Sequence, residues 1–142
     1  MFGNFAAKET IMKKNRIIYW IATVLVTAGM LMSGSMYLTM NPEIANGFKM
    51  LGYPVYFVYM LGVAKIAGSL LLVLPVGSRV KEWVYAGFAF CFAGAVWSHI
   101  ATGTPFIAPL VFLAVLAVSY VFSRKLEPAG SKRSVRMQGA AA

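Results

Sequence analysis

Lys65 is the residue whose type and position point most directly to chemistry. It lies eleven residues into an apolar run from Pro54 to Leu74 that holds no other charge. That distance is about 16 Å along a helix and places the amine near the midplane of a bilayer. A charged lysine at this depth costs about 2.5 kcal/mol or more, so we expect a partner or an aqueous pocket beside it. One interpretation is a substrate or anion site. The alternative is a structural lysine bonded to carbonyls and hydroxyls of neighbouring helices.

Small residues surround Lys65 on its own helix face. Gly62 and Gly68 stand three residues to either side, and Ser69 follows four residues later, whereas Leu61 interrupts this face. Small side chains let membrane helices approach closely. The pattern predicts that Lys65 points into a helix bundle, with Gly62 and Gly68 as structural positions.

His99 and Glu43 are the other ionisable candidates near the membrane core. His99, the one histidine, lies near the end of the run 82–100, and is either an interfacial hydrogen-bonding residue or a proton-transferring group. About 10 Å of axial separation from Lys65 follows from the helical rise, so the two residues can line one cavity without touching. Glu43 can pair with Lys65 only if its segment dips into the membrane.

A polar stripe marks the first apolar run. Its members recur at intervals of three, four and seven residues, so they share one helix face, and we expect that face to contact protein. The alternative for each threonine is a hydrogen bond to its own helix. The stripe consists of Tyr19, Thr23, Thr27, Gly34 and Tyr37.

An aromatic face recurs every seven residues along the third run. Trp83, Phe90 and Trp97 form it, with Gly87 and Gly94 on the same sector. We expect packing against other helices, and the alternative is binding of a flat ring such as a quinone or sterol. Trp83 and Trp97 also lie near the two membrane interfaces, where tryptophan is commonly enriched.

The composition excludes several classes of protein. Of the 142 residues, 60% are hydrophobic and 12% are charged, which rules out a water-soluble domain. With Cys91 as the single cysteine, one histidine and four carboxylates, we expect no intramolecular disulfide, no metal site and no catalytic constellation. The net charge of +9 is concentrated beside apolar runs, so we expect no nucleic-acid partner.

Four apolar runs are long enough to cross a bilayer. They cover residues 17–40, 54–74, 82–100 and 106–123. If all four span, eleven of the 13 lysines and arginines share one side, so both termini should be cytoplasmic. A cleaved signal peptide ending near Ser33-Gly34-Ser35 is the alternative for the first run.

The segments outside the runs have distinct characters. Residues 1–16 form a basic cytoplasmic N-terminus, and residues 124–142 are expected to be a disordered basic tail. Between the first two runs, Asn41 can cap a short helix that begins at Pro42 and ends before Gly52. The sequence therefore predicts an all-α, four-helix membrane bundle with a short interfacial helix between spans one and two.

Several motifs resemble the DoxX-like membrane proteins. They are Gly52-Tyr53-Pro54, Leu61-Gly62-Val63-Ala64-Lys65 and the run Lys81-Glu82-Trp83-Val84-Tyr85-Ala86-Gly87-Phe88. The resemblance covers about residues 17–123 and implies a four-helix membrane protein with both ends cytoplasmic. A second lysine that relatives often carry at the end of the first span is absent. The positions that match the recurring family motif are Gly52, Pro54, Lys65, Glu82, Ala86, Gly87 and His99.

Function is less constrained than architecture. Some members of the family that this chain resembles are linked to quinol-oxidising or thiol-stress complexes, and animal relatives look like receptor-assembly chaperones. We expect a non-catalytic accessory protein that binds a partner membrane protein or a lipid-like small molecule in a polar intramembrane cavity. The alternatives are a quinone-linked redox subunit and a transporter of a small anion or proton. Expected binding residues are Lys65, His99, Tyr37, Glu43 and Trp97.

No cofactor is evident in the sequence, although a quinone or lipid fits the apolar composition. The expected partners are the lipid bilayer and either a membrane protein or further copies of the chain. The expected location is a membrane that the chain crosses several times, the plasma (inner) membrane if the source is bacterial.

Overall fold

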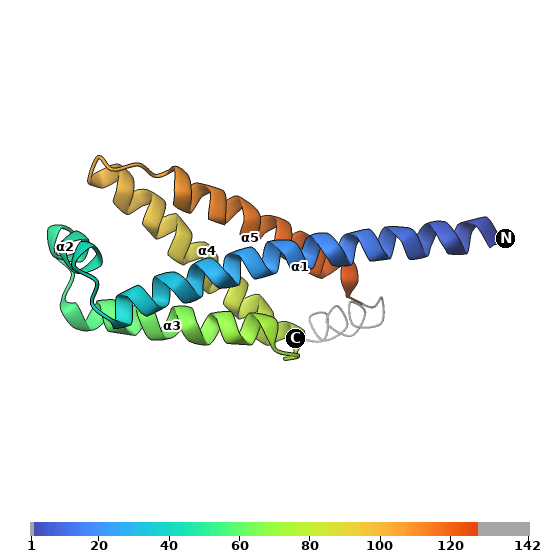
Figure 1. Ribbon diagram of the computed structural model, residues 1–142, viewed down its shortest axis with the longest axis horizontal. Helices are drawn as coiled ribbons and strands as arrows, with labels where there is room; N and C mark the ends of the chain where they lie inside the picture. The colour runs from blue at the N-terminus through green and yellow to red at the C-terminus, as the bar shows by residue number, and fades with distance from the viewer. Residues whose placement is uncertain (1, 128–142) are drawn as a thin grey trace, which may run out of the picture.

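Five helices make up residues 2–127, the part of the chain that the computed structural model describes (Figure 1). They are α1 (Phe2–Leu38), α2 (Pro42–Met50), α3 (Val55–Val73), α4 (Ser78–Ala101) and α5 (Ile107–Leu126). All but α2 are long and apolar enough to cross a membrane. The predicted all-α architecture, with four spans and a short helix between the first two, is confirmed.

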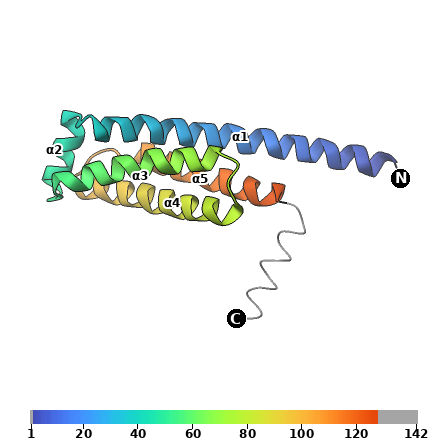
Figure 2. The ribbon, with the colours of Figure 1, turned by 90° about the horizontal axis from the view of Figure 1, so that it is seen from below.

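The four long helices pack as a ring in the order α3, α1, α5, α4. The α1–α3 and α1–α5 contacts are the most extensive, and the contact that closes the ring, between α3 and α4, is the smallest of the four. One end of the bundle carries α2 and the loop before α5, and we call it the α2 end. The other end, which we call the basic end, carries the α3–α4 loop and the last turn of α5, and α1 extends beyond it (Figure 2).

Three helices differ in length from the apolar runs. α1 includes the basic residues of segment 1–16, and its residues 3–14 are exposed. α4 starts at Ser78, four residues before the expected span, and α5 continues to Leu126. Hydropathy marks the part of a helix that lipid covers, whereas the helix itself continues until a residue or a cap ends it. The expected disordered tail thus begins with a helical turn, and its residues 128–142 lie outside the described part.

α2 forms as its capping signals predict. The Asn41 side chain accepts a hydrogen bond of 3.0 Å from the Glu43 N–H, and Pro42 occupies the first turn. Gly52 ends the segment with φ of +76°, which favours glycine. Phe48 contacts the rings of Tyr37 and Phe57, so α2 is held against α1 and α3.

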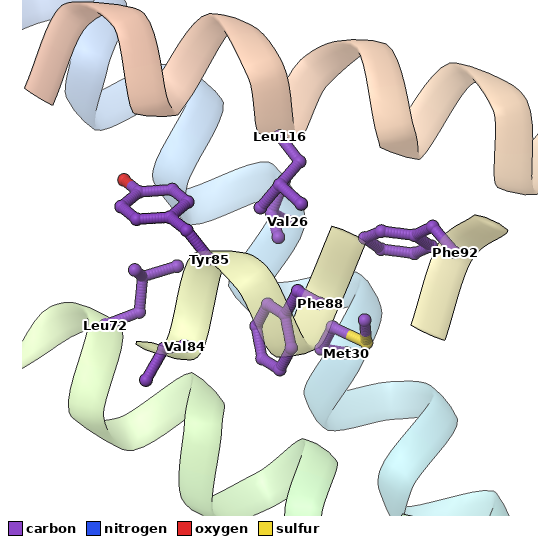
Figure 3. Packing of buried hydrophobic residues seen from close by; sticks show 8 residues of the cluster. All are labelled: Val26, Met30, Leu72, Val84, Tyr85, Phe88, Phe92 and Leu116. Carbon is purple, nitrogen blue, oxygen red and sulfur yellow. The ribbon is translucent and has the colours of Figure 1, made fainter. Parts of the chain in front are cut away.

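The apolar core draws residues from all four long helices (Figure 3). Many other large apolar side chains point outwards, which suits a bundle whose solvent is lipid. The core cluster comprises Val26, Met30, Leu72, Val84, Tyr85, Phe88, Phe92 and Leu116.

Two glycines bring α1 and α3 together beside Lys65. A Cβ on Gly34 would lie 2.9 Å from Ile66 Cγ1 and 3.2 Å from the backbone oxygen of Gly62. A Cβ on Gly62 would lie 3.0 Å from the Cβ of Tyr37. A side chain at either position requires Ile66 or Leu38 to move and the facing helix to give by a few tenths of an ångström, so the two glycines permit the close approach of α1 and α3.

We therefore expect Gly34→Ala to lower the melting temperature of the protein in detergent. Alanine favours a helix over glycine by about 1 kcal/mol, so a loss of stability must come from the contact with α3. Gly94→Ala is the matched control, because a Cβ there meets nothing within 4 Å, and it should melt at the same temperature or higher. Equal changes of melting temperature in the two variants would contradict a close approach of α1 to α3 at Gly34.

Candidate functional site

Lys65 is buried between α3 and α1, with 7% of the residue exposed. Its ammonium donates a hydrogen bond of 2.8 Å to the Ser33 hydroxyl. The same nitrogen lies 3.6 Å from the centroid of the Tyr37 ring, a cation–π contact. Two neutral groups of α1 thus hold the amine, and the predicted inward direction of Lys65 is confirmed.

No carboxylate of residues 2–127 pairs with Lys65. The ion pairs of Arg124 use Glu82 and Glu127 at the basic end, while Glu43 is exposed in the first turn of α2. A hydroxyl and an aromatic face stabilise an ammonium without cancelling its charge. No negative charge within residues 2–127 therefore balances the charge of the Lys65 ammonium.

A groove of about 360 Å³ runs between α3 and α4 and includes Lys65 in its wall. It exists because α3 and α4 carry small residues here: Gly87 has no atom within 4 Å of where its Cβ would be. Gly68 gives space to the ring of Phe88, which would lie 2.7 Å from an added Cβ. Apart from Lys65 and the half-buried Cys91, the wall is apolar: Leu61, Ala64, Ala67, Gly68, Leu71, Val80, Trp83, Val84, Gly87 and Phe88.

A second buried polar cluster ties three helices together nearer the basic end. The Ser119 hydroxyl lies 2.7 Å from the Thr23 hydroxyl and 2.8 Å from the Tyr85 hydroxyl. Thr23 and Ser119 are 0% exposed, so these hydrogen bonds are made without water. They link α1, α5 and α4 in a fixed register.

The polar stripe of α1 faces protein, as predicted. Tyr19, Thr23, Thr27 and Gly34 are buried and Tyr37 is half-buried. Thr23 bonds to another helix rather than to its own backbone. The Thr27 hydroxyl is buried and has no hydrogen-bond partner within the described chain.

His99 and Glu43 lie apart from Lys65. His99 Nδ1 is 2.7 Å from the Thr104 hydroxyl, and the same threonine is 2.9 Å from the Thr102 hydroxyl. This small network fixes the loop after α4 at the α2 end, and His99 does not line the groove that contains Lys65. Among the expected binding residues, the structure thus brings together Lys65 and Tyr37.

The aromatic face of α4 points away from the bundle. Trp83 and Phe90 are each 81% exposed and Trp97 is 76% exposed, so the prediction that they pack inside the chain was wrong. The seven-residue repeat placed them on one face correctly, but the repeat carries no information on which face meets the other helices. Trp83 alone of the three borders the groove.

The expected structural positions are explained by geometry. Gly52 adopts a positive φ, Pro54 precedes the first turn of α3, and Gly62 and Gly68 lie at the close contacts described above. Glu82, a position of the family motif, accepts a 2.6 Å ion-pair contact from Arg124 of α5. Patterns along single helices do not predict the roles of Ser33, Ser119 and Arg124, because their partners lie on other helices.

A sequence model of the DoxX-like family matches residues 21–121, well over half of the chain. The chain belongs to the DoxX-like family. No curated protein and no solved structure matches it. The matched region of this DoxX-like protein includes α2, the Lys65 contacts with Ser33 and Tyr37, and His99. This membership and the four apolar helices indicate that the chain is a multi-pass membrane protein. The predicted family resemblance is confirmed.

We expect Ser119→Ala to destabilise this DoxX-like protein in detergent by about 1–2 kcal/mol, because the buried hydroxyls of Thr23 and Tyr85 then lose their shared partner. Ser35→Ala is the control, since the exposed Ser35 hydroxyl has Met32 O of its own helix as its one hydrogen-bond partner among residues 2–127. Thermal melting followed by circular dichroism measures both. If Ser119→Ala and Ser35→Ala melt at the same temperature, the hydroxyl cluster adds no stability.

Proposed function

We propose that this DoxX-like protein is a non-catalytic membrane accessory protein whose α3–α4 groove binds a lipid-like molecule with an acidic or strongly hydrogen-bond-accepting group. The observation that carries the proposal is a buried Lys65 in the wall of the groove, whose partners among residues 2–127 are all neutral.

Electrostatics favour an anionic occupant. An ammonium ion in a low-dielectric interior is strongly stabilised by an opposite charge, and the described carboxylates are placed elsewhere. A bound carboxylate or phenolate would supply the missing charge. Ser33 and Tyr37 keep the amine in place when that group is absent.

The shape and lining of the groove favour an apolar body on that occupant. Its volume of about 360 Å³ falls within the usual range for small-molecule sites, which are mostly apolar with a few placed polar groups. This lining differs from the polar cavity expected from the sequence. The groove lies at the smallest contact of the helix ring, so a molecule dissolved in the bilayer has a lateral route to it.

The other candidate functions receive less support. A proton-transferring redox site that uses Lys65 and His99 together requires the two in one cavity, and His99 does not line the groove. Transporters often bind substrate where a spanning helix is interrupted, whereas α1, α3, α4 and α5 are continuous. A partner membrane protein or a second copy of the chain, resting on the aromatic face of α4, is the alternative accessory role.

Binding can be tested with cis-parinaric acid, a fluorescent fatty acid, and its methyl ester in nanodiscs. We expect the wild type to prefer the acid by about tenfold, because a hydrogen bond to a charged group contributes about 1.5–3 kcal/mol. Lys65→Met should fold normally and lose this preference. Lys49→Met, which removes an exposed lysine of α2, should keep it.

Two results would contradict the groove site. One is equal binding of acid and ester by the wild type, and the other is a Lys65→Met variant that still distinguishes them. A Lys65→Met variant that melts markedly lower would instead assign Lys65 to structure. Cys91→Ser should keep the preference for the acid, because serine is similar in size to the cysteine of the groove wall and Lys65 is unchanged.

We further propose that the basic end faces the cytoplasm, because arginine and lysine accumulate there. Reporter fusions after Ser123 should then report the cytoplasmic side, and fusions near Ala101 should report the opposite side. The reverse pattern would overturn this orientation, and identical signals from both fusions would contradict four spans.

A further inference from the structure

A second pocket, of about 260 Å³, opens at the basic end of the bundle, away from the Lys65 groove. Tyr19 of α1 and Val76 of the α3–α4 loop contribute to its wall, and the rest comes from the start of α4 and the end of α5. The hydroxyl cluster around Ser119 lies beneath it, since Tyr85 belongs to both. Three spanning helices therefore hold this pocket in place.

Charged side chains of both signs line the pocket in equal number. Lys81 and Arg124 are the cations, and Glu82 and Glu127 are the carboxylates. Arg124 Nη1 contacts Glu82 at 2.6 Å and Glu127 at 3.1 Å. The formal charges of these four groups cancel.

Much of the hydrogen-bonding capacity of these groups is unused within the part of the chain that the structure describes. Lys81 is half-buried and has no partner among residues 2–127. Both ion pairs of Arg124 use Nη1, although a guanidinium carries five N–H donors. Each carboxylate can accept further hydrogen bonds, because its two oxygens offer about four acceptor sites.

The depth of the pocket matches that of lipid head groups. Lys81 stands in the first turn of α4 and Arg124 in the last turn of α5, where spanning helices leave the hydrocarbon. Tyr19 and Tyr120 lie in the same wall, and tyrosine is enriched at this level of a bilayer. Tyr120 is 38% exposed, so part of this side chain remains accessible at the pocket.

We infer that this pocket binds the head group of a zwitterionic phospholipid with a primary ammonium, the phosphoethanolamine type. The phosphate lies against Lys81 and the free N–H groups of Arg124, and the ammonium lies against Glu82 and Glu127. Balanced charges in the pocket favour a head group whose own charges cancel. A choline group cannot donate N–H hydrogen bonds to the carboxylates, and a purely anionic head group leaves the two carboxylates without an added cation.

The inference is tested by titrating the purified full-length protein with phosphatidylethanolamine, phosphatidylcholine and phosphatidylglycerol of identical acyl chains and measuring retained lipid by native mass spectrometry. We expect phosphatidylethanolamine to be retained about tenfold better than the other two. Lys81→Met should lower its retention. Lys125→Met is the matched control, because Lys125 lies at the same end but outside the pocket wall.

A second variant tests the ammonium half of the site. Glu127→Gln leaves the pocket with a net positive charge, so it should shift the preference from phosphatidylethanolamine towards phosphatidylglycerol. Melting curves of each variant confirm that it is folded.

Three results would overturn the inference. They are equal retention of the three lipids by the wild type, the same loss in Lys125→Met as in Lys81→Met, and an unchanged preference in Glu127→Gln. Soluble O-phosphoethanolamine serves as a further probe. If it binds more tightly than the lipid, the lipid assignment is overturned in favour of a soluble phosphate compound.

Discussion

The close approach of α1 and α3 at Gly34 and Gly62 is the constraint on which the rest of the bundle depends. It brings the Ser33 hydroxyl and the Tyr37 ring to the Lys65 ammonium, which would otherwise meet lipid at a high free-energy cost. With α3 held to α1 in this way, α3 meets α4 only lightly, and the groove remains between α3 and α4. The small residues thus have two effects. Gly34 and Gly62 allow α1 and α3 to pack tightly, and Gly87 leaves space between α3 and α4.

The polar groups of this DoxX-like protein fall into separate regions with different physical roles. The cluster of Thr23, Tyr85 and Ser119 is dry and satisfied, so it fixes the register of three helices and has little capacity left for a ligand. Within residues 2–127, the charge of Lys65 is not compensated by a carboxylate, and the basic end has unused donors and acceptors. Free charge and free hydrogen-bonding capacity, rather than burial alone, distinguish candidate binding sites from structural polar contacts.

The outer surface follows from lipid as the solvent. Trp83, Phe90 and Trp97 are exposed on α4, as apolar side chains are when the bundle is surrounded by hydrocarbon or by another membrane protein. Because lipid is as apolar as a protein core, outward-facing and inward-facing helix sides have similar hydropathy, and packing is decided by small and polar residues. For this reason the polar stripe correctly predicted which face of α1 points inwards, whereas the aromatic repeat gave the wrong inward face for α4.

The sequence by itself determined the number of spans, the α2 helix with its Asn41 cap, the inward direction of Lys65 and the family, because each depends on local composition or on short motifs along one helix. It also placed Tyr37 among the candidate residues. Tertiary structure alone decided the partners: Ser33 for Lys65, Ser119 for Thr23 and Tyr85, and Arg124 for Glu82. A helical repeat shows which residues of one helix share a face, whereas a contact between helices depends on their rotation, axial shift and separation. Those quantities are fixed by packing at positions such as Gly34 and Gly62, far apart in sequence and joined only in the folded bundle.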